Sequence, residues 1–245
     1  SATTDFGCGM AQALGIRFYN ENDSLIDDFM NGYLMGDVHR IDWSQMLPEL
    51  GKVDIQVACD VDNPLLGPEG AVYTYSPQKG ADAHMCAVLE KNMKHIAALA
   101  AHQGRDVRDC AGAGAAGGLG GGVMAFFNGQ LKRGIHLVLD ALQFEDKIVG
   151  AHLIITGEGR LDEQTVFGKT IAGVCAVAKR RNIPVVALAG MVDMDINKIK
   201  SIGLCAAFSI CHRPISLEQA IADAAPLVER AAENMAGLFQ AGFVL

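Results

Sequence analysis

The sequence predicts an α/β fold made of two α/β domains. Two continuous apolar runs, over residues 151–157 and 183–190, end in glycine, which is typical of buried parallel strands. Apolar residues at helical spacing follow the first of these runs. Aromatic residues make up only 6% of the chain, while alanine and glycine are abundant. This composition favours close-packed α/β layers over a β-sandwich.

The C-terminal half is the more regular part of the chain. The runs "AHLIITG", "IPVVALAG" and "LCAAFSIC" predict three strands, with a helix in "GKTIAGVCAVAKRRN" and a shorter helix before the third strand. A long last helix over 216–242 opens with Ser216 and Gln219 at the spacing of a capping box. This order predicts a Rossmann-like domain over 131–245 with a parallel sheet. Because three strands make a thin sheet, we expect the domain to lack its N-terminal strand.

The N-terminal half is less regular. Residues 1–130 predict a mixed α/β domain that is incomplete at its start, and "SATTDFGCGMAQALG" predicts a polar cap followed by a helix. Residues 53–60 predict a strand that ends at an aspartate, and apolar spacing predicts a helix over 81–102. At the start of the second domain, "IHLVLD" predicts a short strand over 135–140.

Charge and composition exclude several classes of partner. The formal net charge is −8 and no long basic run occurs, which argues against binding to nucleic acid or to an anionic membrane. No apolar stretch reaches the roughly 18 residues that a membrane span needs. The seven cysteines include no C-x-x-C pair and lie mostly among apolar neighbours, as expected of core residues in a reducing compartment. With no visible signal peptide, these features predict a cytoplasmic location.

The densest motif is the glycine-rich stretch "DCAGAGAAGGLGGG" over 109–122. Its "GAGAAG" matches G-x-G-x-x-G, and Asp140 lies about where a ribose-binding acid would, but charged residues precede the motif where a dinucleotide site needs a buried strand. Packing of a helix against its neighbour would explain the glycines at 120–122. A second interpretation is a backbone site for an anion at a helix N-terminus. That site would use Gly112, Gly114, Gly117 and Gly118.

A second motif, "TGEGRLDEQTVFGKT", begins where a predicted strand ends. Open α/β sheets bind ligands at this edge. The "GKT" at its end resembles a P-loop, but Glu163 stands where that pattern needs glycine, so the motif is not a Walker A loop. Gly157 and Gly159 would let the backbone approach a ligand closely.

The charged residues of the second motif suit phosphoryl transfer. Arg160 and Lys169 supply cations for phosphate oxygens, and Glu158 or Asp162 supplies a carboxylate for Mg²⁺ or for the accepting hydroxyl. The alternative is a solvated loop held by salt bridges.

A third motif, "ACDVDNPLLGPEGA", follows the strand predicted over 53–60. Its Asp60, Asp62 and Asn63 suit either a cation or sugar-like hydroxyls, or they cap an Asx turn. Asp5 in the opening segment poses the same choice between helix cap and ligand contact.

Together these motifs resemble the bacterial type I glycerate kinases. The stretches "SATTDFGCGM", "ACDVDNPLLGPEGA", "GAGAAGGLG" and "ITGEGRLDEQTVFGKT" occur in the family's order, and with "IPVVALAG" the resemblance covers nearly the whole chain. The chain looks like the C-terminal two-thirds or so of such an enzyme. It lacks the strand and the acidic-Ser-Lys segment with which the family usually begins, which puts activity of the chain alone in question.

The resemblance implies ATP- and Mg²⁺-dependent phosphorylation of D-glycerate, usually to 2-phosphoglycerate. It implies two α/β domains, of which the Rossmann-like one is discontinuous and the other lies on the substrate side. The glycine backbone over 112–118 would hold a phosphate or the glycerate carboxylate, and Arg160 and Lys169 would neutralise the transferring charge. Glu158 and Asp162 would bind Mg²⁺ or orient the attacking hydroxyl. The glycerate side would be lined by Asp5, Asp60 and Asn63.

Three alternatives stay open. The product could be 3-phosphoglycerate, or the chain could be a non-catalytic module that binds a small anion or a nucleotide. A Rossmann dehydrogenase would instead bind NAD at Gly112–Gly117 with Asp140. The oligomeric state is also open, a homo-oligomer included.

Overall fold

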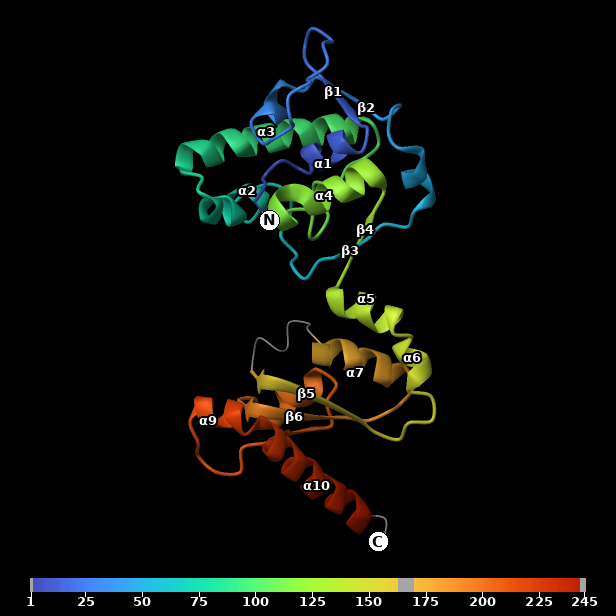
Figure 1. The fold of residues 1–245 in the computed structure, drawn as a ribbon, viewed down its shortest axis with the longest axis vertical. Helices are drawn as coiled ribbons and strands as arrows, with labels where there is room; N and C mark the ends of the chain where they lie inside the picture. The colour runs from blue at the N-terminus through green and yellow to red at the C-terminus, as the bar shows by residue number, and fades with distance from the viewer. Residues whose placement is uncertain (1, 163–169, 243–245) are drawn as a thin grey trace. The chain divides into compact units, whose positions relative to one another are not determined.

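The computed structural model describes residues 2–162 and 170–242. The chain divides into two compact units, Ser1–Gly134 and Ile135–Leu245, and each is described by itself (Figure 1). No helix among the described residues is both long enough and apolar enough to cross a membrane.

The first unit contains four α-helices, four short strands and three 3₁₀ turns among its described residues. In chain order these are α1 (Cys8–Ala13), β1 (Arg17–Tyr19), η1 (Leu34–Asp37), β2 (Arg40–Asp42), η2 (Pro48–Lys52), β3 (Gln56–Ala58), α2 (Ala71–Tyr75), η3 (Pro77–Lys79), α3 (Ala83–His102), α4 (Ala115–Phe127) and β4 (Gln130–Lys132). Strands β1 and β2 pair antiparallel, and β3 and β4 pair parallel. The mixed α/β character predicted for this half is therefore present.

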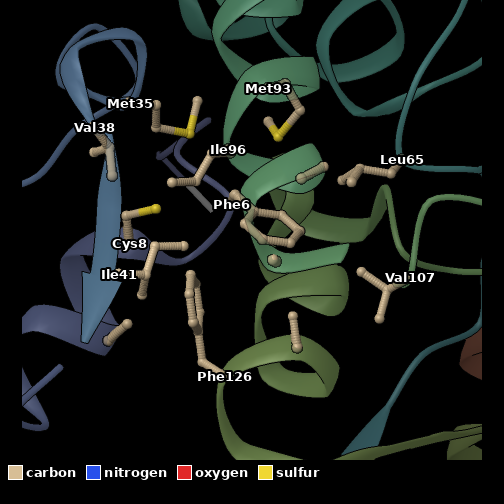
Figure 2. Close-up of a cluster of buried hydrophobic side chains, with 14 of the residues drawn as sticks. Phe6, Cys8, Met35, Val38, Ile41, Leu65, Met93, Ile96, Val107 and Phe126 are labelled. Carbon is tan, nitrogen blue, oxygen red and sulfur yellow. The ribbon is translucent and has the colours of Figure 1, made fainter. Parts of the chain in front are cut away.

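The core of the first unit is built around two phenylalanines. The rings of Phe6 and Phe126 meet edge to face with their centroids 5.4 Å apart, and Phe18 packs on Phe126 at 6.0 Å. Figure 2 shows Met93 and Ile96 of α3 and Phe126 of α4 converging with Phe6 in one cluster. All of these side chains are fully or almost fully buried.

The glycines of α4 allow backbone to pack against backbone, as the packing interpretation of 120–122 predicts. A Cβ atom at Gly122 would lie 2.0 Å from the carbonyl oxygen of Phe6, and one at Gly121 would lie 2.8 Å from the Phe6 ring. At Gly120 it would lie 2.4 Å from the carbonyl oxygen of Gly112. A larger residue at Gly121 or Gly122 would push α4 away from Phe6, and one at Gly120 would push it away from Gly112.

Helix α1 begins on a carboxylate cap. Asp5 is only 6% exposed, and its Oδ1 and Oδ2 accept the backbone N–H groups of Gly7 and Gly9, each at 3.0 Å. These amides belong to the first turn, where a negative charge also interacts favourably with the helix dipole. Asp5 thus accepts amides at the start of α1 from a position two residues before the N-cap, Gly7, and its predicted ligand contact stays a prediction.

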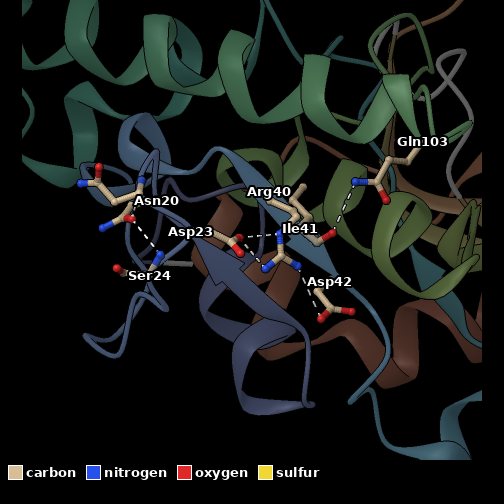
Figure 3. Close-up of polar contacts among 8 residues, drawn as sticks. Asn20, Asp23, Ser24, Arg40, Ile41, Asp42 and Gln103 are labelled. Atoms are coloured by element: carbon tan, nitrogen blue, oxygen red, sulfur yellow. Dashed lines mark hydrogen bonds and ion pairs between the residues drawn. The ribbon is translucent and has the colours of Figure 1, made fainter.

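The pair of strands β1 and β2 is held by ion pairs and by Gln103, the residue that follows α3 (Figure 3). The Arg40 guanidinium lies 2.6 Å from Asp23 and 3.7 Å from Asp42. At the other side, the Gln103 side-chain amide donates to the carbonyl of Ile41 at 3.3 Å. These contacts fix the start of the long connection between the two strands.

The second unit is a three-layer α/β arrangement. Its elements are α5 (Gly134–Ala141), α6 (Phe144–Lys147), β5 (Ile154–Leu161), α7 (Thr170–Arg180), β6 (Val185–Val192), α8 (Ile196–Ser201), β7 (Ala206–Ser209), α9 (Leu217–Ala222) and α10 (Ala224–Gly242). The strands form a parallel sheet in the order β5-β6-β7, with Thr156 opposite Ala187 and Leu188 opposite Phe208. The order predicted for 151–242 is confirmed.

The two faces of the sheet are covered by different helices. On β6, Val185, Ala187 and Ala189 belong to a buried cluster with residues of α7 and α8. Val186 and Leu188, which alternate with them, belong to a second cluster with residues of α10. Figure 1 shows α7 and α10 on opposite sides of the sheet. Helices on both faces of a parallel sheet are the doubly wound pattern.

Residues 135–140 form helix α5, so the strand predicted there is wrong. Ile135 and Leu139 lie one helical turn apart, and both belong to the cluster beneath α7. The short apolar run fits a helix and a strand equally well, and packing against α7 decides for the helix. The strand predicted over 53–60 is present but is limited to 56–58.

The last helix is broken into α9 and α10 at Asp223. Pro226 lies four residues after Ala222, where its ring would clash with that carbonyl in a continuous helix. Half of the predicted capping box is present, since the Ser216 hydroxyl accepts the Gln219 N–H at 3.2 Å. The Gln219 side chain instead donates to Asp223 at 2.7 Å.

We expect Gly122→Ala to lower the free energy of unfolding of the first unit by about 2–3 kcal/mol, because the added methyl overlaps the Phe6 carbonyl. Gly51→Ala is the matched control, because a Cβ there meets nothing within 4 Å. Trp43, the only tryptophan, packs against Phe126 of α4 and reports urea unfolding of this unit by fluorescence. Equal midpoints for the two variants would contradict the packing.

Asp5→Asn should cost about 1–2 kcal/mol of stability, because the NH2 group that replaces one carboxylate oxygen cannot accept the N–H of Gly7 or Gly9, and the negative charge is lost. Asp27→Asn, at an exposed position, should stay within about 0.5 kcal/mol of the wild type. Urea titration monitored at Trp43 measures both. A neutral Asp5→Asn would mean that the cap adds nothing to stability.

Candidate functional site

A left-handed turn shapes the start of α4. Ala116, Gly117 and Gly118 have φ values of 54°, 73° and 89°, a conformation that glycine adopts without strain. The carbonyl of Gly117 accepts the Phe6 N–H at 3.4 Å. A Cβ at Gly117 would lie 2.1 Å from the carbonyl oxygen of Thr3 and 2.9 Å from the Lys79 ammonium. The opening segment and the Lys79 side chain therefore pack directly against this turn.

The other glycines of the predicted anion site are also buried against neighbouring backbone and side chains. The Gly114 N–H donates to the carbonyl of Asn63 at 3.0 Å, and the Gly118 N–H donates to Gly114 at 3.3 Å. A Cβ at Gly112 would lie 2.9 Å from the Cys59 sulfur. The amides of Gly114 and Gly118 are thus already used within the protein, and packing accounts for these positions.

The dinucleotide alternative is wrong. Residues 103–114, which precede α4, contain turns and no strand, whereas the fingerprint requires a strand before its first glycine. Asp140 lies within helix α5 and does not end a strand.

A cavity of about 620 Å³ is lined by the opening segment and by Lys79. We call it the Lys79 cavity, and residues 2–5, 30–33 and 76–89 contribute to its walls. We call the part of its lining formed by Thr4, Asp5, Ser76 and Lys79 the polar end, and several other lining residues are apolar. The apolar wall includes Met30, Val88 and Leu89.

The polar end places a cation, a carboxylate and two hydroxyls together. The Lys79 ammonium donates to the carbonyl of Thr3. Burial lowers the pKa of Lys79, and the nearby carboxylate of Asp5 partly opposes that effect. The hydroxyls of Thr4 and Ser76 lie 3.0 Å apart. This arrangement suits a small polar anion that carries hydroxyl groups.

Asp60 and Asn63 do not line the Lys79 cavity. Asp60 accepts the backbone N–H of Gly134 at 2.9 Å. The Asn63 side chain donates to the carbonyl of Glu69 at 2.8 Å and accepts from the Tyr75 hydroxyl at 2.7 Å. Both residues hold loops in place, so of the three residues predicted for the glycerate side only Asp5 borders this cavity.

A second cavity, of about 1170 Å³, lies at the carboxyl end of the parallel sheet in the second unit. We call it the sheet-edge cavity. Four residues predicted from the second motif line it, all from β5. They are Gly157, Glu158, Gly159 and Arg160. This is the edge at which open α/β sheets bind ligands.

The predicted charged residues of the sheet edge have distinct surroundings. The Oε2 atom of Glu158 is buried and has no hydrogen-bond partner among the described residues. Arg160 is held by Asp162 at 3.1 Å and by Asp193 at 3.2 Å. Lys169 lies outside the described residues. Arg160 therefore forms the salt bridges of the second interpretation of its motif, while Glu158 keeps a carboxylate oxygen that no described residue satisfies.

Divalent metal binding at this edge would rest on few protein ligands. Within the described residues no group of three or more His, Cys, Asp or Glu side chains is arranged to hold a metal ion. Glu158 and Asp162 are four residues apart on an extended backbone, roughly 13 Å along the strand. Mg²⁺ commonly binds one or two carboxylates together with phosphate and water, and the orphaned oxygen of Glu158 fits that requirement.

Sequence reasoning missed two basic residues, Lys79 and Arg213. Lys79 stands alone in a polar loop, and only the packing of η3 against the opening segment brings it to a cavity wall. Arg213 lines the sheet-edge cavity a few residues after β7. A signal existed for Arg213, because a basic residue just beyond the carboxyl end of a parallel strand lies at the ligand edge.

Comparison with known proteins shows which family the chain resembles. The model of the glycerate kinase family matches residues 1–240. A glycerate kinase of Halalkalibacterium halodurans is 44% identical over 237 residues, which is 96% of this chain and 62% of that protein. The glycerate 2-kinase of Escherichia coli is 40% identical over 245 residues, which is 99% of this chain and 63% of that protein.

A solved structure gives the same result. The crystal structure of a protein named as a glycerate kinase 2, from Salmonella typhimurium LT2, matches with a TM-score of 0.81 and 42% identity. The match covers 100% of this chain and 63% of that one. The chain thus spans less than two-thirds of the length of these relatives. Since the family model and the relatives both extend over nearly all of its residues, the chain belongs to the glycerate kinase family.

Proposed function

We propose that the protein phosphorylates D-glycerate to 2-phosphoglycerate, with ATP as phosphoryl donor and Mg²⁺ as metal ion. Membership of the glycerate kinase family supports the substrate, and the name of the Escherichia coli relative, a glycerate 2-kinase, supports the position. The observation that carries the proposal is the sheet-edge cavity, which combines a large apolar wall with charged groups suited to phosphates.

The nucleotide would occupy the sheet-edge cavity. Its volume of about 1170 Å³ exceeds that of most small-ligand pockets and leaves room for a nucleoside with its phosphates. Leu188, Ile210 and Ile221 offer apolar contacts for a base. Gly157 and Gly159 let the β5 backbone approach the phosphates closely.

Cations for the phosphates would come from Arg160, Arg213 and Lys169. Arg160 is 55% exposed, and exposed ion pairs such as those with Asp162 and Asp193 contribute little energy. A phosphate can therefore compete for its guanidinium without a large cost.

Bound Mg²⁺ would supply positive charge for the phosphates. Glu158 would hold it through the orphaned oxygen, and Asp162 would bind it through water or orient the attacking hydroxyl. In the reaction, the 2-hydroxyl oxygen of glycerate forms a bond to the γ-phosphorus as the bond from that phosphorus to the β-phosphate oxygen breaks. The hydroxyl proton passes to a carboxylate, and ADP leaves.

On the glycerate side, Asp5 would accept a hydrogen bond from a substrate hydroxyl at the polar end of the Lys79 cavity. Asp60 and Asn63 would act by bracing the loop that packs on the glycine stretch. Gly112, Gly114, Gly117 and Gly118 would act through the shape that they give to this region. A cytoplasmic location belongs to the same proposal, since all seven cysteines are free thiols.

The test is a coupled assay of the purified protein with ATP, Mg²⁺ and D-glycerate, in which ³¹P NMR distinguishes 2-phosphoglycerate from 3-phosphoglycerate. We expect Glu158→Gln to raise the Mg²⁺ concentration needed for half-maximal rate roughly tenfold, because it removes the charge but keeps the shape. Glu229→Gln, at an exposed position of α10, is the matched control.

Unchanged Mg²⁺ dependence in Glu158→Gln would overturn the metal-binding role of Glu158. Binding of ATP without turnover of glycerate would favour the non-catalytic module instead. Formation of 3-phosphoglycerate would overturn the proposed position of transfer and leave the kinase activity standing.

A further inference from the structure

We propose that Lys79 binds the carboxylate of the hydroxy-acid substrate and that the polar end of the Lys79 cavity is the subsite for this anion. The inference rests on the proposed function for the identity of the acid. It assigns the anion to a side chain and not to the amides of the glycine stretch.

The first argument is position. The ammonium of Lys79 lies in the cavity wall, where it donates to the carbonyl of Thr3. It also lies against the left-handed turn at Gly117, where any Cβ would come within 2.9 Å of it. Carbonyl and turn together restrict an otherwise flexible side chain to one place. A cation held in this way loses little further conformational freedom when it binds an anion.

The second argument is charge. Among the described residues that line the cavity, Lys79 and Asp5 carry the formal charges at neutral pH, and His84 is an exposed titratable group. Lys79 can therefore pair with one anionic group, and the adjacent Asp5 carboxylate disfavours any further negative charge. A nucleotide triphosphate carries several negative charges and would meet one lysine beside a buried aspartate. The balance therefore favours a carboxylate over a polyphosphate.

The third argument is the complement of hydrogen-bonding groups. Each carboxylate oxygen of Asp5 accepts one backbone N–H and retains a further lone pair. Thr4 and Ser76 add hydroxyls that both donate and accept. A substrate with one carboxylate and adjacent hydroxyls can place its carboxylate on Lys79 and its hydroxyl groups on these acceptors. A simple fatty acid would leave them unmatched.

The same geometry gives Gly117 a positioning role. Its φ of 73° and the 2.1 Å approach to the Thr3 carbonyl allow no side chain at this position. A substitution there would displace both the carbonyl and the lysine that it holds. One glycine of the stretch thus acts on the anion indirectly, through the place that it leaves for Lys79.

The test combines kinetics with binding in the purified protein. Lys79→Gln should raise KM for D-glycerate roughly 10- to 100-fold, the usual value of a charge-assisted hydrogen bond, with KM for ATP within twofold of wild type. The control is Lys52→Gln, at the exposed end of η2, which should leave both KM values unchanged. A rise in KM for ATP alone would overturn the proposal, since Lys79 would then serve a phosphate.

Calorimetric titration without ATP separates the inference from the proposed function. Wild type should bind D-glycerate at least roughly tenfold more tightly than uncharged glyceramide, and Lys79→Gln should lose this preference. Inorganic phosphate, as a competing anion, should bind more weakly than D-glycerate. If wild type prefers D-glycerate over glyceramide but shows no turnover, only the proposed function is overturned. If Lys79→Gln keeps this preference for D-glycerate, only the carboxylate subsite is overturned.

A measurement on the wild type covers the case in which Lys79→Gln does not fold. Acylation of lysines, followed by mass spectrometry, should slow at Lys79 when D-glycerate is bound and should not change at Lys52. Saturating glycerate with no protection of Lys79 would overturn the assignment.

Discussion

The close approach of residues 3–7 to the glycine stretch is the constraint on which the first unit depends. The Phe6 N–H bonds to the Gly117 carbonyl, its ring packs on Phe126, and its own carbonyl lies where a side chain at Gly122 would stand. Each glycine within a helix costs about 1 kcal/mol relative to alanine. The loss is offset because backbone contact lets one short segment supply a core aromatic, the cap of α1 and the polar end of a cavity.

The fold of the second unit could be predicted in large part. The order of strands and helices over 151–242 was predictable, because buried parallel strands are continuously apolar and the helices between them keep their period. The strand predicted over 135–140 was wrong because a run of six mixed residues fits a strand or a helix. Contact with α7 stabilises the helix. The break in the last helix at Asp223 could have been predicted from Pro226, because its ring prevents a continuous helix.

Some residues of the candidate site could be predicted from the sequence and others could not. Gly157, Glu158, Gly159 and Arg160 were found by position alone, at the carboxyl end of a predicted strand, and they line one cavity. The strand itself extends to Leu161, so these residues lie within β5 and not in a loop after it. Asp60 and Asn63 also follow a strand, yet their side chains satisfy backbone groups of neighbouring loops. Lys79 carries no local pattern at all. The role proposed for it depends on a contact with Thr3, which is 76 residues away, and no spacing rule reaches that far.

The sheet order has a thermodynamic consequence. Among the described residues, β6 alone has strands on both sides, whereas β5, which carries Glu158 and Arg160, pairs only with β6. Edge elements open locally at lower free energy than central ones. A molecule that contacts β5 and β6 together would stabilise the state in which the two strands are paired. Binding of such a molecule should therefore slow amide hydrogen exchange along β5.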